Sequence, residues 1–183
     1  NGLTELTRDL RSSNLLDYNP EYITYPVNLS SDTFEKIFIS ESWQVVANFS
    51  AHKHVRSEKD KISVEALIKN NVFGAIKLLN LCHLNPPKYF FSVSTDKAAN
   101  PVNIMGASKS LMEKLIISKK EDFRVSTARF ANVAFSNGSL LDGFIFRLIK
   151  KQPLSCPSDI KRFFVTPEQS GQICLLATFL GET

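Results

Sequence analysis

The chain has 183 residues, of which 43% are hydrophobic and 22% charged, so it is long enough for one domain with a buried core. Its net charge of +4 is spread along the sequence with no dense Lys/Arg tract, which suits an anionic small molecule and disfavours nucleic acid. No apolar run is as long as a membrane span and no signal peptide is recognisable. We therefore expect a cytoplasmic protein with no membrane span in this segment.

The predicted elements alternate between helix and strand. Apolar residues at helical spacing predict helices over residues 3–10, 30–39, 63–85, 106–120, 139–151 and 166–180. β-Branched, aromatic or continuous apolar runs predict strands over residues 22–29, 43–51, 88–94, 124–133 and 162–166. This alternation predicts an α/β fold with a mostly parallel sheet and helices on both faces.

Three loops are expected to face one site, because ligands of such sheets bind beyond the carboxyl ends of the strands. One of them continues the buried strand "KYFFSVS" as "STDKAANPVNIMGASK" and presents Thr95, Asp96 and Lys97 together. Met105 and Lys109 follow, one helical turn apart and on one face. Taken singly, each polar residue suits a solvated turn or helix; together they favour a site in which an Asp–Lys pair serves as acid and base once desolvated.

The two other loops also carry polar residues. "AHKHV" contains His52, Lys53 and His54, but the two histidines lack a third ligand at useful spacing, so no metal site is expected. A hydrogen-bonded structural role stays open for either histidine. The loop "RFANVAFSNGS" is rich in small residues that let backbone amides approach an anion, although it also suits an ordinary turn, and Arg129 before it suits a structural role equally well.

The cysteines give no sign of a metal or disulfide framework. Cys82, Cys156 and Cys174 are odd in number, far apart and without a CxxC pair. Buried, reduced thiols are the expectation.

The three polar stretches together resemble one known family. "SAHKHVRSEKD", "STDKAANPVNIMGASK" and "ARFANVAFSNGS" are similar, in order and spacing, to the extended short-chain dehydrogenase/reductase superfamily. The resemblance is narrower to its polysaccharide-biosynthesis (capsule) branch, the UDP-N-acetylglucosamine 4,6-dehydratases. It implies a Rossmann-like, doubly wound fold. Residues 1–135 would form part of the NAD(P)-binding domain, and residues 136–183 part of a small C-terminal nucleotide-sugar-binding region.

The resemblance also implies roles for individual residues. Catalytic positions are Thr95, Asp96, Lys97, Met105 and Lys109. Cofactor contacts are Ser50, Ala51, Ser94 and Lys109. Substrate contacts are Lys53, His54, Asn132, Ser139 and Arg162. Many family members have tyrosine where this chain has Met105, but the dehydratase branch often has methionine there, so the proton work would move to Thr95, Asp96 and Lys97.

The implied activity is a UDP-sugar 4,6-dehydratase that uses bound NAD or NADP and works as a homo-oligomer. A UDP-sugar epimerase of the same fold, or a non-catalytic binding module, are the alternatives. A dinucleotide site needs a glycine-rich turn, and none of the seven glycines forms a GxxGxxG or GxGxxG pattern. Family members have this turn nearer their N-terminus, so we expect the chain to be part of a longer protein and to hold the cofactor poorly by itself.

Overall fold

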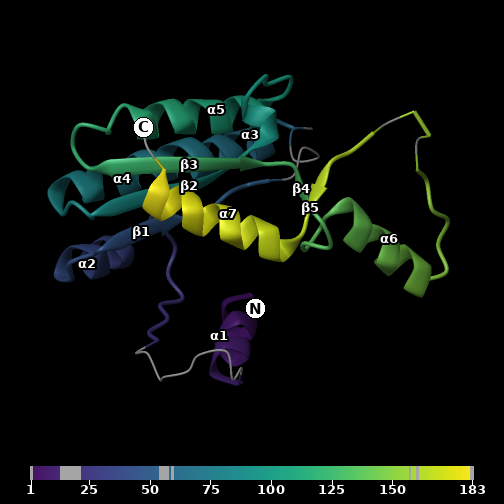
Figure 1. The fold of residues 1–183 in the computed structure, drawn as a ribbon, viewed down its shortest axis with the longest axis horizontal. Coiled ribbons are helices and arrows are strands. Elements are labelled where there is room, and N and C mark those ends of the chain that lie inside the picture. The colour runs from purple at the N-terminus through teal and green to yellow at the C-terminus, as the bar shows by residue number, and fades with distance from the viewer. Residues whose placement is uncertain are drawn as a thin grey trace.

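The computed structural model describes residues 2–12, 22–53, 58, 60–156, 158–159 and 161–181 (Figure 1). The helices are α1 (Gly2–Ser12), α2 (Asp32–Ser40), α3 (Lys61–Ile68), α4 (Gly74–Leu84), α5 (Ile104–Ile117), α6 (Leu140–Ile149) and α7 (Pro167–Leu180). A π-helical turn, η2 (Lys69–Phe73), joins α3 to α4, and a 3₁₀ turn, η3 (Asp96–Ala98), precedes α5. The strands are β1 (Val45–Asn48), β2 (Tyr89–Thr95), β3 (Arg124–Phe130), β4 (Asn132–Val133) and β5 (Phe164–Val165).

The main sheet has the strand order β1-β2-β3, and every neighbouring pair is parallel. Phe90 in the central strand pairs with Val46 on one side and Val125 on the other. A second, two-stranded parallel sheet joins β4 to β5. The α/β class and the parallel sheet predicted from the alternating pattern are confirmed.

The core lies between the sheet and the helices α4 and α5. Phe90, Val125, Leu79 and Met112 are buried in one cluster there, and each such side chain contributes about 1.5–3 kcal/mol when it leaves water. The other face is covered by α7, whose Phe179 ring meets Tyr89 edge-on at 5.4 Å between centroids. Helices therefore cover both faces, as Figure 1 shows.

Side-chain caps fix where the helices near the site begin. Asn103 accepts a hydrogen bond from the Gly106 N–H at the start of α5, and Ser139 accepts one from Asp142 at the start of α6. Thr166 and Gln169 form a reciprocal capping box before α7, with Pro167 in the first turn. These caps satisfy backbone donors that would otherwise lack partners.

The strand predicted over residues 22–29 is wrong. This segment is irregular in the structure: the Val27 N–H bonds back to the Tyr25 carbonyl, 2.8 Å away, and Pro26 has no N–H to donate to a ladder. Its alternating apolar side chains, Tyr25, Val27 and Leu29, line a groove instead. Their shared position on the groove explains the strand-like pattern without strand pairing.

The cysteines only partly follow expectation. Cys82 is fully buried, and burial raises the pKa of its thiol to about 12, whereas Cys156 is exposed and Cys174 half-buried. Cys156 lies in the irregular segment between α6 and β5, away from any core. Separately, none of the helices in the described part of the chain is long and apolar enough to cross a membrane.

Candidate active site

The three predicted loops meet at one end of the main sheet. Because β1, β2 and β3 are parallel, the segments that follow Asn48, Thr95 and Phe130 leave the same edge, and Thr95 pairs with Phe130 in register. The Lys53 ammonium donates to the backbone carbonyl of Asn137, which links the loop after β1 to the turn that follows β4. The structure thus brings together residues that are far apart in sequence.

Asp96 is the centre of a small polar cluster at the end of β2. Its Oδ1 accepts hydrogen bonds from the Thr95 hydroxyl at 2.9 Å, the Lys97 backbone N–H at 2.9 Å and the Lys97 ammonium at 3.0 Å. Burial acts to raise the pKa of Asp96, but the bonds from Lys97 and Thr95 outweigh it and the pKa lies below its ordinary value. In the free protein, Asp96 and Lys97 therefore form an ion pair that is still open to solvent.

Met105 and Lys109 both point inward from α5, as their spacing predicts. Each is only 4% exposed. The Lys109 ammonium donates to the carbonyl of Val93 at 2.9 Å, two residues before Thr95. Burial lowers the pKa of Lys109 to about 8, although the nearby Glu113 carboxylate acts in the opposite direction.

The first turn of α5 packs directly on the polar cluster. A Cβ atom at Gly106 would lie 2.6 Å from the Lys97 carbonyl oxygen, so only glycine permits this approach. The N–H groups of Ile104 and Met105 donate to the carboxylate of Glu58, at 3.3 and 2.7 Å. This contact adds a negative charge at the positive end of the α5 dipole.

The residues expected to contact a dinucleotide lie along the carboxyl ends of β1 and β2. Ser50 donates through its N–H and hydroxyl to the Asn48 side chain, at 3.1 and 2.7 Å, and Ala51 is half-buried next to it. The Ser94 hydroxyl is buried and makes no hydrogen bond of good geometry with the described residues. A buried hydroxyl next to Val93, whose carbonyl holds the Lys109 ammonium, could meet the ribose end of NAD(P), whereas the sequence offers no glycine-rich turn for the pyrophosphate.

The residues expected to contact substrate lie around the small β4–β5 sheet, except His54, which falls outside the described residues. The backbone and side-chain nitrogens of Asn132 donate to the Phe163 carbonyl, at 3.3 and 3.5 Å, so Asn132 lies beside the exposed Arg162. Ser139 caps α6, which gives its hydroxyl a structural task.

Asn71 is a buried polar residue that the sequence analysis did not identify. Asn71, in the π-helical turn η2, holds the backbone of His52 from both sides, accepting from its N–H at 2.8 Å and donating to its carbonyl at 3.1 Å. It also donates to the Ser108 hydroxyl on α5 at 3.0 Å. π-Helical turns frequently occur at functional sites. The signal in the sequence was the pair Asn70-Asn71 inside an otherwise apolar helix.

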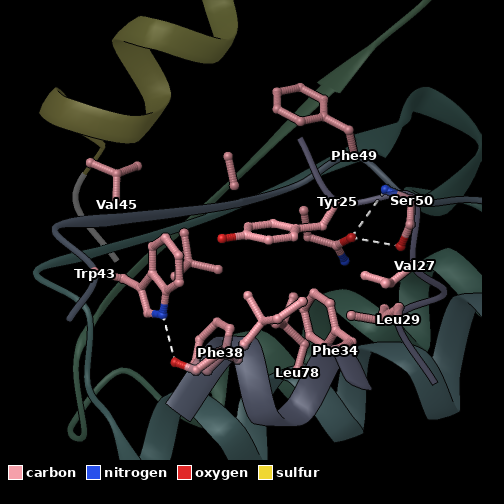
Figure 2. A pocket seen from close by; sticks show the side chains of 14 residues that line it. Tyr25, Val27, Leu29, Phe34, Phe38, Trp43, Val45, Phe49, Ser50 and Leu78 are labelled. Atoms are coloured by element: carbon pink, nitrogen blue, oxygen red, sulfur yellow. Dashed lines mark hydrogen bonds between the residues drawn. The ribbon is translucent and has the colours of Figure 1, made fainter. Parts of the chain in front are cut away.

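An open groove runs along the free edge of β1, away from the polar cluster (Figure 2). Its cavity of about 470 Å³ is mostly apolar and reaches Ser50 at one end. It is lined by Tyr25, Val27, Leu29, Phe34, Ile37, Phe38, Trp43, the residues of β1, Phe49, Ser50 and Leu78. Such a lining can bury apolar surface but offers little acid–base chemistry, so the candidate site is the polar cluster.

The architecture defines a class of fold. The three-stranded parallel sheet with helices on both faces has the Rossmann-like fold of NAD-dependent epimerases and dehydratases. The solved structure of UDP-glucuronic acid 4-epimerase from Bacillus cereus, in complex with UDP-glucuronic acid and NAD, shares this fold with a TM-score of 0.78 and 18% identity. The match covers 97% of this chain and 62% of that one.

The chain belongs to the polysaccharide biosynthesis protein family, whose model matches residues 19–183. It is 33% identical to a UDP-N-acetylglucosamine 4,6-dehydratase (inverting) of Campylobacter jejuni, over 59% of this chain and 34% of the relative. It is 34% identical to a UDP-glucose 4-epimerase of Rickettsia bellii, over 62% of this chain and 35% of the relative. The chain is thus related to NAD-dependent UDP-sugar dehydratases and epimerases. It spans 44%, 23% and 23% of the length of three further curated relatives.

Proposed function

We propose that the protein of which this chain is part is a UDP-sugar 4,6-dehydratase that acts on UDP-N-acetylglucosamine in glycan biosynthesis. The observation that carries the proposal is the Asp96–Lys97 ion pair, 3.0 Å between Nζ and Oδ1, at the end of β2, with Met105 in the adjacent turn of α5. A 4,6-elimination needs both a base at C5 and an acid at the C6 oxygen, and this pair offers one of each.

NAD or NADP, when bound, would supply the transient oxidation at sugar C4 that acidifies the C5 hydrogen, and would return the hydride to C6 after water has left, while C5 takes a proton from solvent. The Thr95 hydroxyl would bond the C4 oxygen, and Lys109 would hold the nicotinamide ribose. Burial already acts to raise the pKa of Asp96, and a sugar that excludes water strengthens this effect. A proton can then pass from the Lys97 ammonium to Asp96, which leaves a neutral amine and a neutral acid.

The two groups then complete the elimination. The Lys97 amine takes the proton from C5, and Asp96 gives its proton to the C6 oxygen, which departs as water. The positive charge of Lys97 faces the negative charge that develops on the sugar. Met105 has no exchangeable proton and serves as packing.

The substrate would extend from this cluster toward the β4–β5 sheet. Lys53, Asn132 and the exposed Arg162 would meet the sugar and the diphosphate, and a guanidinium suits the bidentate contact with phosphate. Division into residues 1–135 and 136–183 stays a prediction, because α7 packs back on β2 and β3. Homo-oligomeric assembly and a cytoplasmic setting belong to the same proposal.

A second candidate is an epimerase of the same fold, which the relative from Rickettsia bellii favours. Both activities begin with oxidation of the sugar. An epimerase returns the sugar at the same oxidation level and with all of its oxygen, so it needs no acid at the C6 hydroxyl.

Mass spectrometry together with ¹H NMR of UDP-N-acetylglucosamine incubated with the whole protein in heavy water distinguishes these functions. Loss of water with gain of one deuterium identifies the dehydratase. A sugar that keeps its oxygen and becomes an epimer, with or without deuterium, identifies the epimerase. An unchanged sugar, with cofactor shown to be bound, contradicts both.

A further inference from the structure

Two charged side chains are buried in the described part of the chain, and they lie one turn apart on the same face of α5. Lys109 is 4% exposed and Glu113 is 3% exposed. A buried ammonium is unfavourable unless a nearby negative charge compensates it. The Lys109 ammonium has one backbone acceptor, Val93, and a sulfur contact with Met112 at 3.5 Å. Neither of these carries a charge.

The Glu113 carboxylate is held in place from the neighbouring strand. Arg129 on β3 donates through Nε to Oε1 at 2.9 Å and through Nη2 to Oε2, a two-pronged contact that fixes the plane of the carboxylate. Burial acts to raise the pKa of Glu113, but the bonds from Arg129, together with the nearby Ser94 hydroxyl, outweigh it and leave the group ionised. Arg129 itself pairs in register with Ser94, a buried serine of β2.

We propose that Glu113, clamped by Arg129, is a positioning residue that keeps the Lys109 ammonium charged and directed at the end of β2. The three side chains then form an alternating series of charges, from the buried Lys109 through Glu113 to the half-exposed Arg129. The inference deepens the proposed function, because it takes Lys109 as the residue that holds the cofactor.

Other charges around Lys109 are already engaged. Asp96 and Lys97 of η3 pair with each other, and Glu58 binds the first N–H groups of α5. The charged residues of α3, η2 and α4 are held in contacts of their own, which are Glu65–Lys69, Lys77–Glu35 and His83–Asp122. Lys61 at the start of α3 is exposed. Glu113 is thus the carboxylate placed to compensate Lys109.

The simpler alternative is that the Glu113–Arg129 pair only ties α5 to β3. The titration of Lys109 distinguishes the positioning role of Glu113 from this purely structural role. It is followed by NMR of ¹³Cε-labelled lysine, and the Lys109 signal is assigned as the one that disappears in Lys109→Met. Wild-type protein should titrate near pH 8. Glu113→Gln keeps a hydrogen-bond acceptor for Arg129 but removes the charge, so the Lys109 midpoint should fall by about one unit, and Glu113→Asp should restore most of it.

Arg129→Gln should move the midpoint the other way, up by about half a unit, because it removes a positive charge and releases the carboxylate. Glu121→Gln, at an exposed carboxylate, is the matched control and should leave Lys109 unchanged. An unchanged midpoint in folded Glu113→Gln overturns the proposal. If Glu113→Gln does not fold, an unchanged or lowered Lys109 midpoint in Arg129→Gln overturns the proposal instead. The titration uses no sugar, so a negative result would overturn the role of Glu113 only. The proposed dehydratase function is tested separately, by the product formed from UDP-N-acetylglucosamine.

Discussion

At the scale of single residues, the buried charge of Lys109 is the feature with the clearest consequence for stability. The folded chain releases this proton near pH 8, whereas an exposed lysine holds it to about 10.5. Between these values the unfolded state binds more protons, so stability should rise with pH across this window. Below pH 8 Lys109 is charged in both states, so the cost of burying its charge lowers the free energy of unfolding by its full amount.

Lys109→Met should therefore stabilise the protein at pH 7, by on the order of 2 kcal/mol after allowance for the lost bond to Val93. The gain should shrink as pH rises from 8 toward 10.5. Urea unfolding at several pH values measures both effects. Lys114→Met, at an exposed position of the same helix, is the control. If the difference in free energy of unfolding between Lys109→Met and wild type stays constant with pH, the buried-charge account is contradicted.

The sequence indicated Thr95, Asp96, Lys97 and Lys109 because each follows or faces the end of a recognisable buried strand. It did not indicate Glu113, because a lone acid inside a helix usually faces solvent. Its burial depends on Arg129, sixteen residues away and on another element. Tertiary partners of this kind leave no local pattern.

At the scale of elements, the contact between η3 and α5 sets the geometry of the site. Gly106→Ala would place a Cβ 2.6 Å from the Lys97 carbonyl, and the helix must shift to relieve this clash. We expect a loss of about 1–3 kcal/mol in the free energy of unfolding and displacement of Lys97. Gly143→Ala in α6 meets nothing within 4 Å and should stabilise by up to about 1 kcal/mol. Thermal unfolding of both variants checks the contrast; equal effects would show that the close approach does not matter.

The π-helical turn η2 fixes the loop after β1 through one side chain. Asn71→Ala would leave the His52 N–H and carbonyl without their partner, so we expect a loss of about 2–4 kcal/mol and faster amide exchange at His52. Asn70→Ala, which removes only a weak bond to Asn71, should change stability by less than about 0.5 kcal/mol. Hydrogen exchange followed by NMR measures the effect; unchanged protection of His52 in Asn71→Ala would refute this role.

Elements were predicted well where a local period determines them. The continuous apolar run of strand β2 and the helical apolar spacing of α7 carry strong local signals. The π-helical turn could not be predicted, because its apolar spacing continues that of α3 and α4. The irregular course of residues 22–29 could not either, because strand formation depends on a neighbour to pair with.

At the scale of the whole molecule, the residues proposed to hold the cofactor would form only part of a dinucleotide site. Ser50 follows β1, Ser94 lies near the end of β2 and Lys109 reaches β2 from α5, but the sequence contains no glycine-rich turn. We expect the 183-residue chain to bind NAD(P) weakly, with a Kd above about 1 mM by calorimetry. Micromolar binding would show that these residues suffice to hold the cofactor.

The parallel architecture followed from the sequence because alternating helices and strands leave few other arrangements. The meeting of three distant loops followed from that architecture. The contacts within the site, such as Lys53 with the Asn137 carbonyl, depend on side-chain packing and emerged only from the structure.

The central claim, that Lys97 and not residue 105 handles the C5 proton, is tested most directly by deuterium exchange at sugar C5. Lys97→Ala and Met105→Leu would be compared in the whole protein, with UDP-N-acetylglucosamine in heavy water and ¹H NMR of the sugar. We predict that exchange at C5 is abolished in Lys97→Ala and changes less than about threefold in Met105→Leu. Full C5 exchange in Lys97→Ala would contradict the account.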